Sequence, residues 1–181
     1  MKRSIAALIG LVLAAVTFVA APASAATPYC PIRWGSLTKS AAGMSSSPLV
    51  NVRAGRHACY DRVVLDVAGT VSGYTVRYVT QVSDQGKGDV VPVRGGARLE
   101  VVALLPAYDN NTGVGTYNPA STSELVNVTG YRTLRQIAWA GSFEGYTSIG
   151  VGVRARLPFR AFVLSGPGAA SRLVVDVAHR W

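Results

Sequence analysis

Short runs of alternating apolar and polar residues, separated by Gly, Pro, Asp and Asn, constrain the fold of this 181-residue chain most strongly. Alternation with a period of two sends successive side chains to opposite faces of an extended strand. Runs of this kind cover residues 61–69, 73–82, 98–107, 133–142, 145–156, 158–166 and 171–179. About seven short strands with such turns predict an all-β sandwich or barrel. The one helical segment we expect is a short one near 121–126.

The alternation also assigns residues to the predicted core. Val63, Leu65 and Val67 share one face of their run. In the next run Tyr74, Val76, Tyr78 and Val82 share a face, so we expect Tyr74 and Tyr78 to be core residues. A third buried face is predicted for Leu99, Val101, Ala103 and Leu105.

A six-residue string near the start of the core returns near the C-terminus. Residues 62–67 read RVVLDV and residues 172–177 read RLVVDV, so Arg and Asp are four residues apart in both. In antiparallel pairing, Arg62 would face Asp176 and Asp66 would face Arg172. Opposite charges across a strand pair contribute roughly 0.2–1 kcal/mol. We therefore expect the first and last core strands to lie in the same sheet.

The N-terminal residues 1–25 have the features of a secretory signal peptide. Lys2 and Arg3 precede an uncharged apolar run, and an Ala-x-Ala cleavage signal ends at Ala25. The apolar run is shorter than the roughly 20 residues that a membrane span needs. We expect an exported, extracellular protein with no integral membrane span after cleavage. The remaining chain divides into an N-terminal arm, 26–52, and a β domain, 53–181.

The two cysteines of the chain, Cys30 and Cys59, both lie in the exported part. An even pair outside the reducing cytosol predicts a disulfide. This bond would staple a loose arm, rich in Ser, Ala and Gly, to the first core strand. The alternative is a nucleophilic Cys59 beside His57, but catalytic Cys and His normally come from separate elements.

Enzyme motifs are largely missing from the sequence. Ser36 and Lys39 fit the S-x-x-K string of β-lactamases, but the later S-D-N and K-T-G elements do not occur. His57 and His179 lack an evident third ligand for zinc. A carboxylate pair of glycosidase type stays open because geometry decides it; the candidates are Asp61, Glu100, Asp109 and Glu144. We expect Asp61 and Glu144 to pair with arginines instead, and residues 109–112 to form a turn. We predict no catalysis, no metal and no cofactor.

The charge balance predicts attraction to anionic polymers. Removing the signal peptide from the +9 chain leaves 16 Lys and Arg against 9 Asp and Glu. An exported protein with this excess is drawn to anionic glycans or phospholipid surfaces, whereas export makes nucleic acid an unsuitable partner. The alternative is that these arginines only decorate solvent-exposed faces. Our candidate ligand-binding residues are Arg154 and Arg156 on one strand face, the nearby Arg160, and Tyr108 and Tyr117 beside a polar loop.

Five strings carry a resemblance to a known family: CPIRWGSLTK, GRHACYDRVVLDVAG, GYTVRYV, FEGYTSIGVGVRARLPFRAFVLSGPG and SRLVVDVAHRW. From about Arg53 to Trp181 the chain resembles the AMIN-like domain of secreted and lipid-anchored actinobacterial proteins. That group is similar in pattern to AMIN domains, which are small β-sandwiches that bring amidases and secretion machinery to the cell envelope. The resemblance implies an antiparallel β-sandwich and a binding role at the wall, and it supplies no catalytic residues.

The predicted function is therefore a non-catalytic, secreted module that binds peptidoglycan or an anionic wall polymer. Two alternatives stay open. One is a carrier of a small apolar ligand, and the other is an enzyme inhibitor that presents the 109–119 loop. The sequence does not define the oligomeric state.

Overall fold

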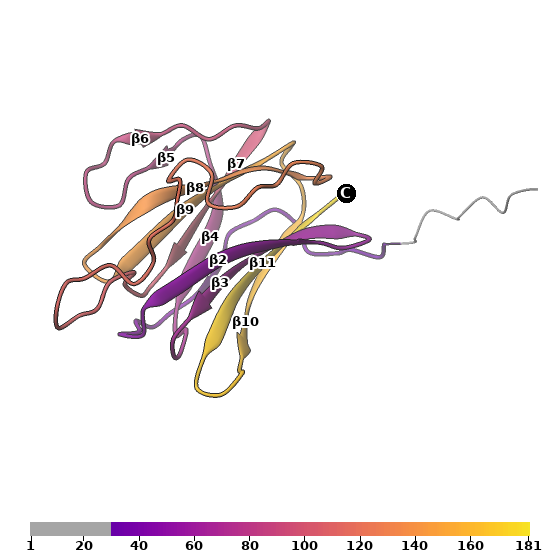
Figure 1. Cartoon of the computed structure of the whole chain (residues 1–181). Helices are drawn as coiled ribbons and strands as arrows, with labels where there is room; N and C mark the ends of the chain where they lie inside the picture. The colour runs from indigo at the N-terminus through magenta and orange to yellow at the C-terminus, as the bar shows by residue number, and fades with distance from the viewer. Residues whose placement is uncertain (1–29) are drawn as a thin grey trace, which may run out of the picture.

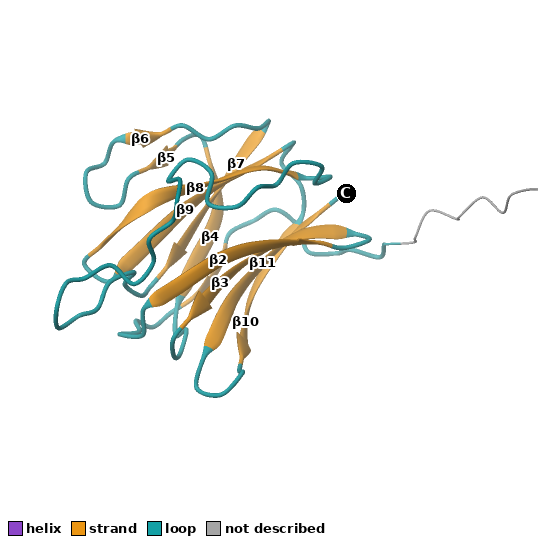
Figure 2. Cartoon of the chain, viewed as in Figure 1, coloured by secondary structure: helices purple, strands orange, loops and turns teal. Residues whose placement is uncertain are grey.

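Antiparallel strands form all of the regular structure in the computed structural model, which describes residues 30–181. Figures 1 and 2 show two sheets stacked face to face, with no helix in the described part. The five-stranded sheet has the order β1 (Lys39–Ala41), β4 (Tyr74–Val79), β7 (Ala97–Ala103), β9 (Tyr146–Val153) and β8 (Leu134–Phe143). The four-stranded sheet has the order β10 (Phe159–Ser165), β11 (Ser171–Ala178), β3 (Tyr60–Val67) and β2 (Leu49–Arg56). A two-stranded ribbon joins β5 (Val82–Ser83) to β6 (Val90–Val91).

The main core lies between the two large sheets. It takes the inward residues of both, including Val63, Leu65 and Val67 from one sheet and Leu99 and Val101 from the other, all nearly inaccessible to solvent. Burial of such side chains stabilises by roughly 1.5–3 kcal/mol each. The predicted β-sandwich and these predicted core faces are confirmed.

The predicted pairing of the first and last core strands is also confirmed. Strands β3 and β11 run antiparallel with Arg62 opposite Asp176 and Asp66 opposite Arg172. The first of these pairs is an ion pair, with 2.6 Å between Nε and Oδ1. The carboxylate of Asp66 instead binds Arg53 on the other neighbouring strand, at 2.8 Å.

The predicted strand over 73–82 is wrong as a single element. It divides into β4 and β5, so Tyr74 and Tyr78 pack on the main core whereas Val82 joins a second cluster. The short helix expected near 121–126 does not form. That segment pairs with the free edge of β8 instead, because Trp139 donates to the Thr122 carbonyl and Leu125 donates to the Ile137 carbonyl.

The N-terminal arm is more ordered than the sequence suggests. Residues 39–41 form β1 and Leu49 begins β2, because Leu49 and Val52 bury their side chains. The carbonyl of Gly35 also accepts a hydrogen bond from Phe159 at the start of β10. The predicted signal peptide, 1–25, lies outside the described residues.

Candidate functional site

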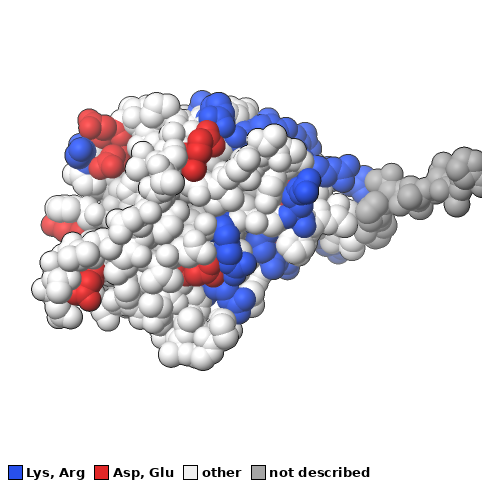
Figure 3. Space-filling view, in the orientation of Figure 1, with Lys and Arg blue, Asp and Glu red and all other residues white. Residues whose placement is uncertain are grey.

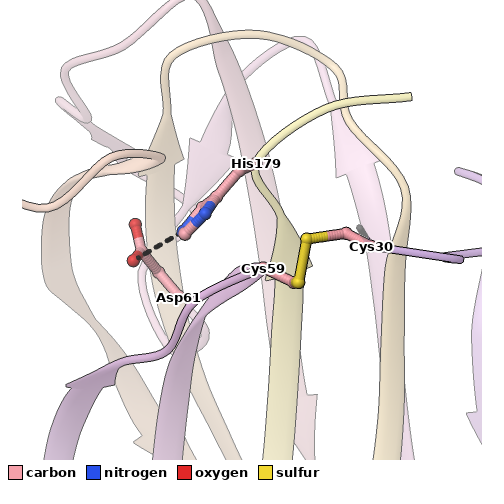
Figure 4. Close-up of a disulfide and its surroundings, with 4 residues drawn as sticks. All are labelled: Cys30, Cys59, Asp61 and His179. Atoms are coloured by element: carbon pink, nitrogen blue, oxygen red, sulfur yellow. Dashed lines mark hydrogen bonds and ion pairs between the residues drawn. A yellow bond between two sulfur atoms is a disulfide. The ribbon is translucent and has the colours of Figure 1, made fainter. Parts of the chain in front are cut away.

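The disulfide fixes one end of the sandwich. Cys30 and Cys59 are bonded as predicted, with 5.6 Å between their Cα atoms. Figure 4 shows this bond next to Asp61 of β3 and His179, which follows β11. The His179 amide donates to the Cys59 carbonyl at 3.0 Å, so the disulfide and the last strand are held together.

Asp61 is a structural carboxylate at this end. Our expectation of an arginine partner is wrong. One oxygen accepts hydrogen bonds from the Thr133 and Leu134 amides at 2.6 and 3.1 Å, and the other lies 3.1 Å from Nε2 of His179. Asp61 is inaccessible to solvent. A buried carboxylate needs this many donors to offset its lost hydration, and they tie β3 to β8 across the sandwich.

Asp176 organises a second group on the outer face of the four-stranded sheet. Its buried carboxylate binds Arg62 and Arg160, with Nε–O distances of 2.6 and 2.8 Å. The hydrogen bond to Asp176 raises the pKa of Arg62 above its already high value. The guanidinium of Arg160 also lies 4.5 Å from the ring of Trp34 and 4.9 Å from that of Phe162. Arg160, one of our candidate residues, therefore shares one buried carboxylate with Arg62 and remains partly exposed.

The turn after β9 carries the other two candidate arginines. Arg154 and Arg156 do not share a strand face as we expected, because β9 ends at Val153 and both follow it in an exposed turn. A guanidinium nitrogen of Arg154 donates to the His179 carbonyl. Arg156 donates to the hydroxyl and the carbonyl of Ser36, at 3.2 and 3.3 Å. These partners orient both side chains and carry no charge.

Three more exposed arginines adjoin this turn. The turn lies beside them because the backbone amide of Arg154 donates a hydrogen bond to the carbonyl of Thr133, which directly follows Arg132. Arg135 donates to the carbonyls of Tyr131, Arg132 and Leu134, and Arg56 lies 5.8 Å over the Tyr131 ring. We call this surface the basic end, which comprises Arg56, Arg132, Arg135, Arg154 and Arg156.

Charge is unevenly distributed over the molecule. On the face drawn in Figure 3, Lys and Arg gather toward the end of the sandwich that carries the C-terminus, and several Asp and Glu lie toward the opposite end. Within residues 30–181, no ion pair to a carboxylate is found for the five arginines of the basic end. The arrangement is a positively charged surface suited to an extended anion.

Tyr108 and Tyr117 lie apart from the arginines. The hydroxyl of Tyr108 accepts a hydrogen bond from the Gly145 amide at 3.0 Å. The ring of Tyr117 packs at 5.6 Å from that of Trp139, and burial raises the pKa of Tyr117. Both residues hold the long 104–133 connection to the sandwich, and within residues 30–181 neither is found in a hydrogen bond or ring contact with an arginine of the basic end.

The predicted turn at 109–112 is confirmed. One carboxylate oxygen of Asp109 accepts from the Thr112 amide at 2.8 Å and from the Asn111 amide at 2.9 Å. These bonds, with one from the Thr112 hydroxyl, lower the pKa of Asp109. The carboxylate is committed to its own turn.

Our sequence reasoning missed Trp34 and considered Ser36 only as part of an S-x-x-K string. Trp34 and Ser36 lie in the arm, where no alternation marks them, yet they contact Arg160 and Arg156. The available signal was their position six residues or fewer after Cys30, which the disulfide fixes.

Among residues 30–181, no group of three or more His, Cys, Asp and Glu is placed to hold a metal ion. Nor does that range contain a helix long and apolar enough to cross a membrane.

Comparison with known proteins supplies the family. No curated protein and no solved structure gives a significant match. The family model of the AMIN-like domain matches residues 47–179, which include β2 to β11 and both strings with Arg and Asp four residues apart. This match spans most of the chain, and the protein belongs to the AMIN-like domain family.

Proposed function

We propose that the protein is a non-catalytic binding module of the cell envelope that holds an anionic wall polymer at its basic end. Membership of the AMIN-like family is in keeping with a cell-wall-related binding module. One observation carries the finer proposal. Arg154 and Arg156 are oriented by carbonyl and hydroxyl oxygens, so their charges are positioned without being neutralised.

The partner of a guanidinium decides whether its positive charge is compensated. A carboxylate partner cancels the charge, whereas a carbonyl only fixes the direction of some N–H groups. The remaining N–H groups can donate to phosphate or carboxylate in the planar geometry that arginine favours. Clustered arginines also raise the local concentration of a polyanion, and salt weakens this attraction.

The test is co-sedimentation of the mature protein with purified cell-wall sacculi across a salt series. Sacculi are used both with their anionic polymers and after these have been stripped. We expect retention on unstripped walls that falls as salt rises. The variant Arg154→Gln with Arg156→Gln should weaken retention by roughly three- to tenfold at low salt.

The matched control is Arg77→Gln with Lys87→Gln, which removes the same charge outside the basic end. Arg77 is bound to Glu100 and Lys87 lies in the β5–β6 turn. Equal losses in both double variants would reduce the effect to net charge and contradict a defined site. Retention on stripped peptidoglycan at high salt would instead assign recognition to peptidoglycan, because screened charge does not explain it.

A further inference from the structure

A second surface lies on the outer face of the five-stranded sheet, where the ribbon β5–β6 rests on β8 and β9. Val82 and Val93 pack there on Ala138 and Ala140 in a small second core. Glycine makes this close approach feasible. A Cβ at Gly150 would lie 2.7 Å from Cγ2 of Val93, so a larger residue would lift the segment away.

The ribbon forms one wall of an open cleft of about 720 Å³. Val90, Val91 and Pro92 line this wall, and the hydroxyl residues Thr122 and Ser123 line another. Small-ligand sites usually measure about 300–1,000 Å³ and combine apolar walls with a few polar groups. The cleft therefore has the size and lining of a ligand site, and its residues are not those of the basic end.

A buried amide fixes the two walls relative to each other. Gln136 is 3% exposed, and its carbonyl oxygen accepts from the Arg94 amide at 2.6 Å. Its NH₂ group donates to the Ser123 carbonyl at 2.8 Å. Both polar ends of the side chain are used, so the cleft is formed before any ligand arrives, and less ordering is needed on binding.

The two arginines of the cleft differ in their charge compensation. Arg94 forms an ion pair with Glu124 and donates to the Arg135 carbonyl. Arg98 uses Nε to bind the Val93 carbonyl at 3.1 Å. Within residues 30–181, no partner is found for Nη1 and Nη2 of Arg98. The cleft therefore presents one uncompensated cation with two free nitrogen atoms, which matches a single carboxylate.

The aromatic lining disfavours a sugar ligand. Trp139 lines the cleft, but its ring packs against Tyr117 and the main core, so it does not present an open stacking face. The accessible side chains of Val90 and Val91 can contact an apolar side chain of a ligand. Arg98 in the same cleft can bind a carboxylate at the end of that ligand's chain. We propose that this cleft binds a short peptide with small apolar side chains through its free C-terminal carboxylate, which Arg98 receives.

The test is a titration of the mature protein with N-acetyl-alanyl-alanine and with its C-terminal amide, each made from L-alanine and from D-alanine. Binding is measured from the NMR chemical shifts of the protein's backbone amides. We expect the acid to shift the signals of Val91, Val93 and Ser123, and the amide to bind about tenfold or more weakly. Arg98→Gln should cause a similar loss. Arg98→Lys, which keeps the charge but not the fork, should retain part of the affinity.

Lys87→Gln is the matched control, because it removes one charge from the turn of the same ribbon without lining the cleft. Equal binding of acid and amide would overturn the proposal, as would unchanged affinity in Arg98→Gln. Shifts caused by a chitin oligosaccharide at the same signals, and none by the peptides, would assign a sugar instead and also overturn it. Arg154→Gln with Arg156→Gln should leave peptide binding unchanged, so the cleft and the wall-polymer proposal fail separately.

Discussion

Two groups of arginines lie within one end of this molecule and are held in different ways. Arg62 and Arg160 share the buried carboxylate of Asp176 on the outer face of the four-stranded sheet. Arg154 and Arg156 lie in the turn after β9 and are held by backbone carbonyls and one hydroxyl. The first group shares one compensating negative charge within the fold, whereas no carboxylate partner is found for the second within residues 30–181.

The two groups show that arginines on one surface can have different roles, one in stability and one in presenting exposed charge. A guanidinium beside a buried carboxylate contributes to stability, because removing either member leaves a charge with reduced hydration. A guanidinium beside a carbonyl at the surface contributes little to stability but is directed outward. Counting arginines in the sequence does not separate these two roles. Substitutions in each group separate the two roles, because they change stability and binding to different extents.

Loss of the disulfide should have the largest effect, because it disturbs both groups. The bond fixes the segment that carries Trp34 and Ser36, which contact one arginine of each group. For a separation of 29 residues, replacing Cys30 and Cys59 by Ser should lower the free energy of unfolding by about 3–4 kcal/mol. Urea unfolding of the oxidised protein and the double variant measures this.

The disulfide variant should also lose retention on unstripped walls, since Ser36 no longer positions Arg156. A stability loss below about 1 kcal/mol would contradict the prediction and show that β1 and β2 hold the arm unaided.

Asp176→Asn should have the next largest effect. The substitution keeps the shape of the side chain but removes the charge that Arg62 and Arg160 share. Because Arg160 is partly exposed, water replaces some of the lost interaction, and we expect a loss of roughly 2–3 kcal/mol. Asp89→Asn, in the exposed β5–β6 turn, is the control. Equal stability of the two variants in urea would show that the compensated group is not a stabilising one.

The strand pairing that creates the compensated group was predictable from the sequence. The two strings with Arg and Asp four residues apart specified that Arg62 faces Asp176, and the register confirms it. Alternation likewise specified the core faces of β3, β4 and β7. These predictions succeed because the period of two is a local property, and antiparallel pairing preserves it.

The basic end was only partly predictable, because its geometry depends on where strands stop. The alternation of 145–156 continues through Arg154 and Arg156, yet β9 ends at Val153. Asp61 shows the same limit, since its donors Thr133 and Leu134 come from the opposite sheet. Unlike the two strings with Arg and Asp, the sequence around Thr133 and Leu134 contains no counterpart of the string around Asp61, so this contact could not be predicted.

Tyr78→Phe should have a smaller effect and tests the support of the turn that carries Arg156. The Tyr78 hydroxyl donates to the Leu157 carbonyl at 2.8 Å and accepts from the Leu157 amide at 2.9 Å. Its loss should lower stability by about 1 kcal/mol at neutral pH. Urea unfolding at pH 7 measures this, with Tyr146→Phe as the control, and an unchanged midpoint would contradict it.

The same variant should change the response to alkali. Burial raises the pKa of Tyr78, so the folded state holds the phenolic proton more tightly than the unfolded chain. The resulting stability is complete below the unfolded pKa of about 10 and is lost as the pH rises above it. The free energy of unfolding of Tyr78→Phe should therefore fall less steeply as the pH rises above about 10 than that of the wild-type protein. An identical slope would contradict a raised pKa for Tyr78 in the folded protein.

Arg154→Gln with Arg156→Gln should change stability least, by about 0.5 kcal/mol or less, and this is the sharpest test of the comparison. Both side chains are exposed, and their carbonyl partners regain water when the guanidinium is removed. The lost contact of Arg156 with the Tyr78 ring, at 5.0 Å, is the main term that remains. Urea unfolding beside wall retention measures both quantities on one variant. If stability fell as far as in Asp176→Asn, Arg154 and Arg156 would be needed for the fold and would not be reserved for a partner.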